Sequence, residues 1–147
     1  MGKIPEEIQK FLKEGRLAYV ATVGPNNEPH VVPKGSLDLL DEMHLIYAEL
    51  REGQTFRNIQ HNPKISVAVV NPLAYRGYEF VGTAEIISRG PEFDMVAYRV
   101  ATQFSNYSKA KHAVKIKVLY IVDLSMGKDK DKIIPVASDR GAAGEKS

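Results

Sequence analysis

The residues from Glu49 to Thr55 form a turn that could bind an anion. Gly53 would let the chain turn after a predicted strand, and Thr55 stands where the N-cap residue of a following helix is expected. Backbone N–H groups at a helix start point outward with a partial positive charge, so they attract a phosphate or a carboxylate. Gln54 and Thr55 could donate further hydrogen bonds, and Arg51 could add a full charge. An ordinary capped helix with a solvated arginine also fits these residues.

A second candidate site is the segment Val31–Gly35, where a predicted strand is interrupted. Pro33 has no backbone N–H and Gly35 has no side chain, so backbone groups stay unpaired on one side and could face the edge of a planar ring. Lys34 adds an ammonium that could bind a phosphate through charge-assisted hydrogen bonds. An edge strand that proline and lysine protect from aggregation would have the same composition.

The elements that would position these two segments are mainly strands. Alternating β-forming residues around a Gly-Pro-Asn-Asn turn predict a hairpin, and the two segments are expected to lie on neighbouring strands. Gly82 predicts a bend or bulge in the longest strand. Strands are expected at 17–23, 29–32, 43–48, 65–70, 77–87 and 114–122, and helices at 4–14 before Gly15, at 56–61 and from Pro91. This pattern predicts a mostly β protein, a small six-stranded antiparallel barrel with short helices.

The end of the chain differs in composition from the rest. Apolar residues become sparse after Leu124, and a charged turn of alternating lysine and aspartate follows. We therefore expect one main domain over residues 1–126, and a C-terminal strand remnant with a flexible tail over 127–147. Within that tail, residues 138–147 are expected to be frayed or disordered.

The composition excludes several classes of protein. A chain of 147 residues is the size of one domain, and the absence of cysteine excludes a disulfide framework, a thiolate metal site and a cysteine nucleophile. The formal charge of +2 comes from interleaved acids and bases, so no nucleic-acid or membrane partner is expected. No apolar run is typical of a signal peptide or a membrane span, which favours a cytoplasmic location.

Several known ligand-binding motifs are also absent. The four histidines, His30, His44, His61 and His112, form no pair at metal-binding spacing, so no metal site is expected. The glycine patterns of Rossmann and P-loop sites do not occur. No residue can be assigned as a catalytic acid, base or nucleophile, and the catalytic residues stay unknown.

Several motifs in a fixed order carry a family resemblance. They are Pro-His-Val-Val-Pro-Lys-Gly, Leu-Ile-Tyr-Ala-Glu, Gly-Gln-Thr-Phe-Arg-Asn-Ile-Gln-His-Asn-Pro, Gly-Tyr-Glu-Phe-Val-Gly-Thr-Ala-Glu-Ile and Gly-Pro-Glu-Phe. Over residues 5–126 the chain resembles the FMN-binding split-barrel family, which is related to pyridoxamine 5'-phosphate oxidase. The resemblance implies a six-stranded split barrel that forms a homodimer, with the flavin in a groove between subunits. A barrel this small cannot enclose a tricyclic ring, which also favours a dimer.

The resemblance implies a set of cofactor-binding residues in the two segments. They are Val32, Pro33, Lys34, Gly35, Ala48, Glu49, Arg51, Gln54 and Thr55. Lys34 would contact the phosphate, and its neighbours would lie along the flavin. Ala48 and Glu49 would form the floor near the ribityl chain. Gln54 and Thr55 would complete the phosphate site with help from the nearby arginine.

The chain departs from the family pattern in ways that bear on function. Members usually carry lysine or arginine where Gln54 stands, so less charge is available for a phosphate unless Arg51 or Arg57 compensates. The chain has no tryptophan and no arginine-rich C-terminal segment, so vitamin B6 oxidation is not expected. The expected function is an FMN-dependent oxidoreductase or electron carrier with a small-molecule redox substrate or an electron-transfer partner. The alternatives are a barrel that binds a deazaflavin or haem, and a non-enzymatic flavin-binding scaffold.

Overall fold

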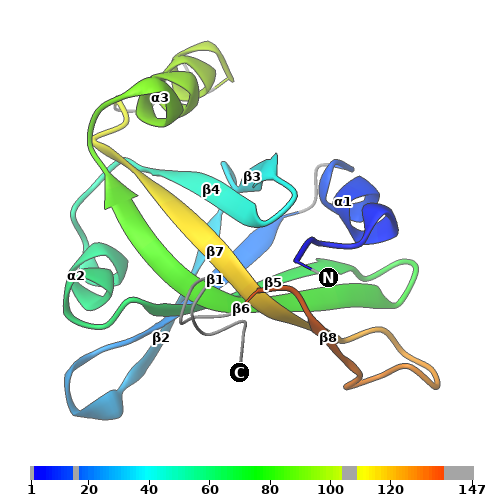
Figure 1. Cartoon of the computed structure of the whole chain (residues 1–147). Helices are drawn as coiled ribbons and strands as arrows, with labels where there is room; N and C mark the ends of the chain where they lie inside the picture. The colour runs from blue at the N-terminus through cyan, green and yellow to red at the C-terminus, as the bar shows by residue number, and fades with distance from the viewer. Residues whose placement is uncertain (1, 15–16, 104–108, 138–147) are drawn as a thin grey trace.

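A single antiparallel sheet of eight strands dominates the computed structural model, which describes residues 2–14, 17–103 and 109–137. The sheet curves into an open barrel with three α-helices at its edges (Figure 1). The elements are α1 (Glu6–Leu12), β1 (Ala18–Val23), η1 (Pro25–Asn27), β2 (Pro29–Lys34), β3 (Asp38–Asp41), β4 (His44–Glu49), α2 (Gln54–His61), β5 (Lys64–Asn71), β6 (Arg76–Ile87), α3 (Pro91–Gln103), β7 (His112–Asp123) and β8 (Ile133–Pro135). The predicted fold class, a mostly β split barrel, is confirmed.

The order of the strands explains why the barrel has a seam, which is the line where its two edge strands face each other without pairing. Neighbouring strands follow the order β2-β1-β5-β6-β7-β4-β3, and β8 pairs with the other end of β7. The edge strands β2 and β3 are therefore consecutive in the chain but do not pair with each other. The short loop between them crosses the seam, and this crossing brings the ends of β2 and β4 together.

The predicted hairpin of β1 and β2 is confirmed. Val20 lies opposite Val32, and Tyr19 lies opposite Pro33. In the turn, Asn26 and Asn27 adopt positive φ angles of 60° and 61°. Asparagine tolerates this left-handed conformation better than most residues, which explains how a turn without glycine at these positions can close.

The predicted bulge at Gly82 is also confirmed. The register between β6 and β7 shifts between Val81 and Gly82. A Cβ atom on Gly82 would lie 2.0 Å from the carbonyl oxygen of Lys117, so only glycine fits here. The bulge increases the local twist of the two long strands and helps the sheet to curl.

The strand β3 was not predicted, and β8 lies within residues 127–147, where a C-terminal strand remnant was expected. β3 has four residues, and aspartates stand at both of its ends, so its composition resembles a loop. β8 has three residues and pairs with β7 through Tyr120 and Pro135, while Val136 beside it is buried. The predicted helix end at Gly15 and the predicted tail at 138–147 lie outside the described residues.

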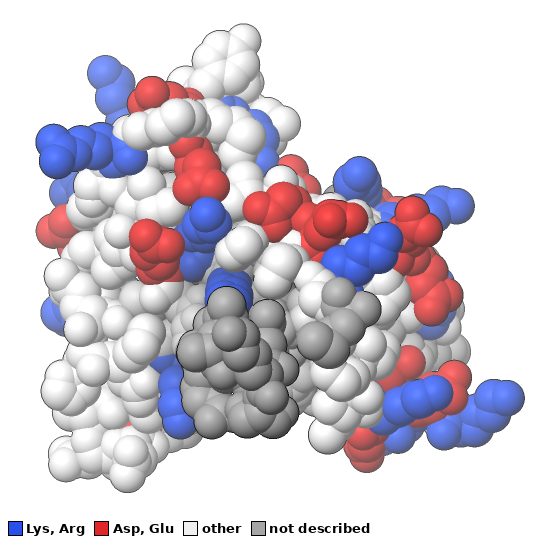
Figure 2. All heavy atoms as spheres, in the orientation of Figure 1, with Lys and Arg blue, Asp and Glu red and all other residues white. Residues whose placement is uncertain are grey.

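The core has two parts. The larger part fills the barrel, where Tyr47 and Phe80 are its largest fully buried side chains and α1 covers one opening. The smaller part lies between α3 and the strands β4 and β7, with Val96 and Val100 from the helix. No helix in the described residues is long and apolar enough to cross a membrane. Basic and acidic side chains are interleaved on the face that Figure 2 shows.

Candidate functional site

Two adjoining hollows lie where β2, β4 and α2 meet. The larger hollow has a volume of about 380 Å³, and the smaller one about 160 Å³. Pro33, Lys34, Gly35, Ser36, Ala48, Glu49, Leu50, Arg51 and Val100 line the larger hollow, and His30, Val32, Lys34, Glu49, Arg51, Gly53, Gln54 and Thr55 line the smaller one. The two linings share Lys34, Glu49 and Arg51. All of the predicted site residues therefore lie in one of two connected linings.

The two candidate segments meet for a different reason from the one expected. They were expected on neighbouring strands, but β2 and β4 lie near opposite ends of the strand order. The seam of the barrel brings them together instead. The Ala48 N–H donates to Ser36 Oγ at 2.9 Å, which ties β4 to the loop after β2.

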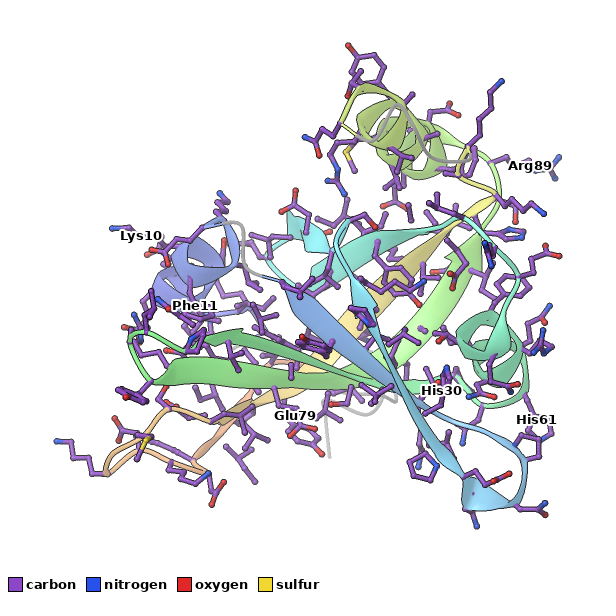
Figure 3. All side chains as sticks on the ribbon, turned by 180° about the vertical axis from the view of Figure 1, so that it is seen from behind. Lys10, Phe11, His30, His61, Glu79 and Arg89 are labelled. Carbon is purple, nitrogen blue, oxygen red and sulfur yellow. The ribbon has the colours of Figure 1, made fainter. Side chains whose placement is uncertain are left out.

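Alternation along β2 directs its side chains into the smaller hollow. His30, Val32 and Lys34 are two residues apart, so they project from the same side of the strand. Figure 3 shows His30 on β2 where this strand passes α2. Pro33 projects from the other side and is exposed. Because β2 is an edge strand, it tolerates a residue that cannot donate to a ladder.

Lys34 and Glu49 form an ion pair in the middle of the site. Lys34 Nζ lies 2.5 Å from Glu49 Oε1, and the Glu49 side chain is only 4% exposed. The same ammonium lies 5.1 Å from the centre of the Tyr47 ring, within the range of a cation–π contact. Glu49 Oε2 and Tyr47 Oη are buried and have no hydrogen-bond partner among the described residues. Burial raises the pKa of the Tyr47 hydroxyl far above its ordinary value, and the Glu49 charge adds to this shift.

The predicted cap of α2 is wrong by two residues. The N-cap is Gly53, without a side-chain hydrogen bond, and Thr55 is the second residue of the helix and is buried. Glycine is an acceptable N-cap residue, and because it has no side chain it leaves the first N–H groups of the helix open to a ligand. The helix therefore begins two residues earlier than predicted, and its first residues border the smaller hollow.

Gln54 belongs to a chain of side-chain hydrogen bonds. Its Nε2 donates to Asn58 Oδ1 at 2.7 Å, and Asn58 Nδ2 donates to Thr22 Oγ1 at 3.0 Å. Arg57 donates to Gln54 Oε1 at 3.1 Å. Arg57 lines neither hollow, whereas Arg51 lines both. Of the two arginines expected to compensate for Gln54, the structure places Arg51 in the site.

A second set of contacts holds the turn before α2. The imidazole of His112 at the start of β7 lies 2.6 Å from Glu52 Oε2 through Nε2 and 2.7 Å from Ser88 Oγ through Nδ1. It also stacks on Phe56, with ring centres 4.6 Å apart. The hydrogen bond from His112 lowers the pKa of the Glu52 carboxyl.

The third wall of the larger hollow comes from α3, which the sequence did not predict as part of the site. Val100 lines the hollow from this helix. Arg99 binds Asp38 Oδ2 at 2.9 Å and donates to the Ser36 carbonyl at 2.8 Å. Val100 follows the apolar pattern of the helix, so the sequence alone marks it only as a core residue.

Solved structures of other proteins share this fold. HupZ from Group A Streptococcus is 34% identical, and the match covers 86% of this chain and 98% of that protein with a TM-score of 0.77. A candidate pyridoxamine 5'-phosphate oxidase from Lactobacillus delbrueckii is 26% identical over 82% of this chain and 94% of its own, with a TM-score of 0.66. An FMN-binding protein from Syntrophomonas wolfei shows the same fold at 19% identity, with a TM-score of 0.68 and coverage of 83% and 92%.

The family of the chain follows from its sequence. No curated protein matches it. The sequence model described as pyridoxamine 5'-phosphate oxidase, however, matches residues 4–124, which include every strand that borders the site. The chain therefore belongs to the pyridoxamine 5'-phosphate oxidase family.

Proposed function

We propose that this protein binds FMN in the paired hollows and acts as an FMN-dependent oxidoreductase or electron carrier. One observation carries the proposal: two segments that are separate in the sequence converge on hollows that share Lys34, Glu49 and Arg51. Membership of a family with flavin-binding members supports the same ligand class.

The linings fit the two ends of a flavin nucleotide. Apolar atoms prevail in the larger hollow, where Ala48, Leu50 and Val100 could pack against a planar ring. Its volume of about 380 Å³ lies within the usual range for small-molecule sites. The smaller hollow offers Arg51 and the start of α2, the groups that a phosphate requires.

FMN supplies the redox chemistry when it is bound, and the protein supplies position and surroundings. Pro33 and Gly35 present backbone at the edge of the larger hollow without extra donors or bulk. Val100 and Leu50 would keep water from the ring. No side chain in the linings is assigned to proton transfer.

We also propose that the protein is a homodimer, because one side of the sheet is apolar and accessible. The strand registers place two rows of side chains across β2, β1, β5, β6, β7 and β8. One row is Val31, Ala21, Ser66, Val81, Tyr120 and Pro135, and the other is Pro33, Tyr19, Ala68, Glu79, Val122 and Ile133. We call these residues the outer stripe. None of them is fully buried.

The outer stripe has the composition of an interface. Its polar members, Ser66 and Glu79, bind each other at 2.6 Å, which partly satisfies the carboxylate. Figure 3 shows Glu79 and Phe11 on opposite sides of the sheet, in agreement with the inward packing of Phe11. Pro33 belongs both to the stripe and to the larger hollow, so a second copy bound here would stand beside the ligand. Accessible apolar patches of this kind usually mark contact surfaces.

Flavin binding can be tested directly on the purified protein. We expect a flavin absorption spectrum, release of FMN on denaturation, and quenching of FMN fluorescence when the flavin-free protein is titrated. Protein that is colourless and takes up no FMN would refute the proposal. Titrations with a deazaflavin and with haem at the same concentration separate FMN from the alternative ligands.

Lys34 offers a sharper test of the site. Lys34→Ala should weaken FMN binding, because the ammonium is lost and Glu49 is left as an unpaired carboxylate beside the ligand. Lys64→Ala, which changes an exposed lysine outside both linings, is the matched control. Equal FMN affinity in the two variants would show that the hollows do not hold the flavin.

A further inference from the structure

The ion pair of Lys34 and Glu49 occupies the place where a ligand would bind, and this inference rests on the proposed function. Both residues line both hollows. Their side chains are 18% and 4% exposed, and Lys34 Nζ lies 2.5 Å from Glu49 Oε1. A surface ion pair would leave the lysine free to turn toward a ligand at little cost. Here the carboxylate is buried, so its need for a cation is much stronger.

The surroundings of the pair make this competition strong. Glu49 Oε2 has no hydrogen-bond partner among the described residues, so Lys34 is the group seen to stabilise the carboxylate. The same ammonium also lies over the ring of Tyr47, and this cation–π contact stabilises it in place. An anionic ligand must therefore draw Lys34 away from Glu49 or share it, and in both cases it approaches a buried negative charge.

The charges along the linings point the same way. Among the residues that the structure describes, the two linings contain one lysine, Lys34, and one arginine, Arg51. The same described residues contain one carboxylate, that of Glu49. Gln54 stands at the position where a lysine or arginine would add positive charge for a phosphate. Its side chain is hydrogen-bonded to Asn58 and Arg57. With Lys34 neutralised by Glu49, Arg51 and the start of α2 remain to attract a doubly charged phosphate.

We infer that Glu49 is a specificity-determining residue, an internal counter-ion that competes with the ligand phosphate for Lys34. The site consequently binds the ring and chain of a flavin but gains little from its phosphate. Flavins with and without the phosphate are therefore held with similar strength and exchange readily. Removing the charge of Glu49 should convert the site into one that prefers the phosphorylated ligand.

The test compares FMN with riboflavin, which has the same ring and chain but no phosphate. The full chain is titrated with each ligand as the wild type, Glu49→Gln, Lys34→Gln and the double variant. We expect Glu49→Gln to bind FMN about tenfold more tightly, a change of about 1.4 kcal/mol. Its riboflavin affinity should change less than about twofold, because riboflavin has no charge to be repelled.

The other variants separate this role from a general effect on the site. Lys34→Gln leaves Glu49 unpaired beside the phosphate and should lower FMN affinity the most. The double variant has neither charge, so its ratio of FMN to riboflavin affinity should return toward that of the wild type. If Glu49→Gln does not fold, the role of Glu49 can still be tested by comparing Lys34→Gln with the double variant. The double variant must then bind FMN more tightly than Lys34→Gln does.

Three outcomes would overturn this role of Glu49. The first is an equal change in FMN and riboflavin affinity on Glu49→Gln, and the second is weaker FMN binding by that variant. The third is a double variant that binds FMN no better than Lys34→Gln. If neither flavin binds any of the four proteins, the proposed function itself is wrong and the role of Glu49 is refuted with it. That result differs from one in which the flavins bind but the ratio of FMN to riboflavin affinity is the same in the wild type and in Glu49→Gln.

Discussion

Asn58 is a single residue that joins α2 to the barrel wall beneath the candidate site. It is 1% exposed, accepts a hydrogen bond from Gln54 and donates one to Thr22. An asparagine in the middle of a short helix indicates no such role in the sequence, because its partner Thr22 lies 36 positions away. Only the folded chain brings the two together.

Asn58→Ala should therefore destabilise the protein. The substitution leaves the Thr22 hydroxyl buried without its donor and the Gln54 amide without its acceptor, at a cost of about 1 to 3 kcal/mol. Urea unfolding followed by circular dichroism measures the change. Gln60→Ala, an exposed change in the same helix, should have little effect. Similar unfolding midpoints for the two variants would contradict the role of Asn58.

The contact between His112 and Glu52 should affect how the protein responds to pH. The hydrogen bond from His112 holds the pKa of the Glu52 carboxyl below its ordinary value, and the smaller effect of desolvation opposes this. Because the folded pKa lies below the unfolded one, the contact stabilises the protein above the unfolded pKa. This contribution is lost as the pH falls through the folded pKa.

His112→Phe keeps a ring against Phe56 but removes both hydrogen bonds. We expect the pKa of Glu52 to rise toward its ordinary value in this variant. An NMR titration of the side-chain carboxyl carbon measures it. His44→Phe removes the histidine that binds Asp41 and should leave Glu52 unchanged. An unshifted Glu52 titration in His112→Phe would show that this hydrogen bond is not formed in solution.

At the scale of elements, the bulge at Gly82 controls how the two longest strands pair. Gly82→Ala would place a methyl group 2.0 Å from the Lys117 carbonyl oxygen, so the backbone of β6 or β7 must move. We expect a loss of stability of about 1 to 3 kcal/mol or more in chemical unfolding. Gly35→Ala is the control, because no atom outside this residue and its two chain neighbours lies within 4 Å of the added Cβ. Equal stability of both variants would contradict this account of the bulge.

The long strands and the bulge could be predicted because the types and spacing of their own residues indicate these structures. β-branched residues alternate in β1 and β7, and Gly82 interrupts an otherwise continuous strand. The start of α2 was misplaced because Thr55 is the better capping residue, yet burial of its side chain makes it a helical residue instead. β3 was missed because pairing with β4, and not its own composition, makes it a strand.

At the scale of the whole molecule, the site depends on the seam of the barrel. The candidate segments could be found from their residue types, but the way in which they meet could not. β2 and β4 lie far apart in the strand order, and curvature accumulated over the intervening strands closes the gap. The contribution of Val100 from α3 likewise depends on where that helix packs.

The outer stripe allows the proposed dimer to be tested on the whole molecule. Val31→Glu places a charge on an exposed stripe residue, and in a two-fold interface each substitution is present twice. We expect the wild type to have the mass of a dimer in light scattering and Val31→Glu to dissociate. The FMN affinity of Val31→Glu should fall when the dimer dissociates, because the outer stripe borders the larger hollow at Pro33.

Leu73→Glu is the matched control for this change. Leu73 is 93% exposed and lies in the turn after β5, outside the stripe, so this variant should stay dimeric and bind FMN normally. A monomeric wild type would contradict the dimer. A Val31→Glu protein that remains dimeric would place the interface elsewhere. If Val31→Glu is monomeric but binds FMN with unchanged affinity, each chain holds its flavin alone, and the second copy forms no wall of the site.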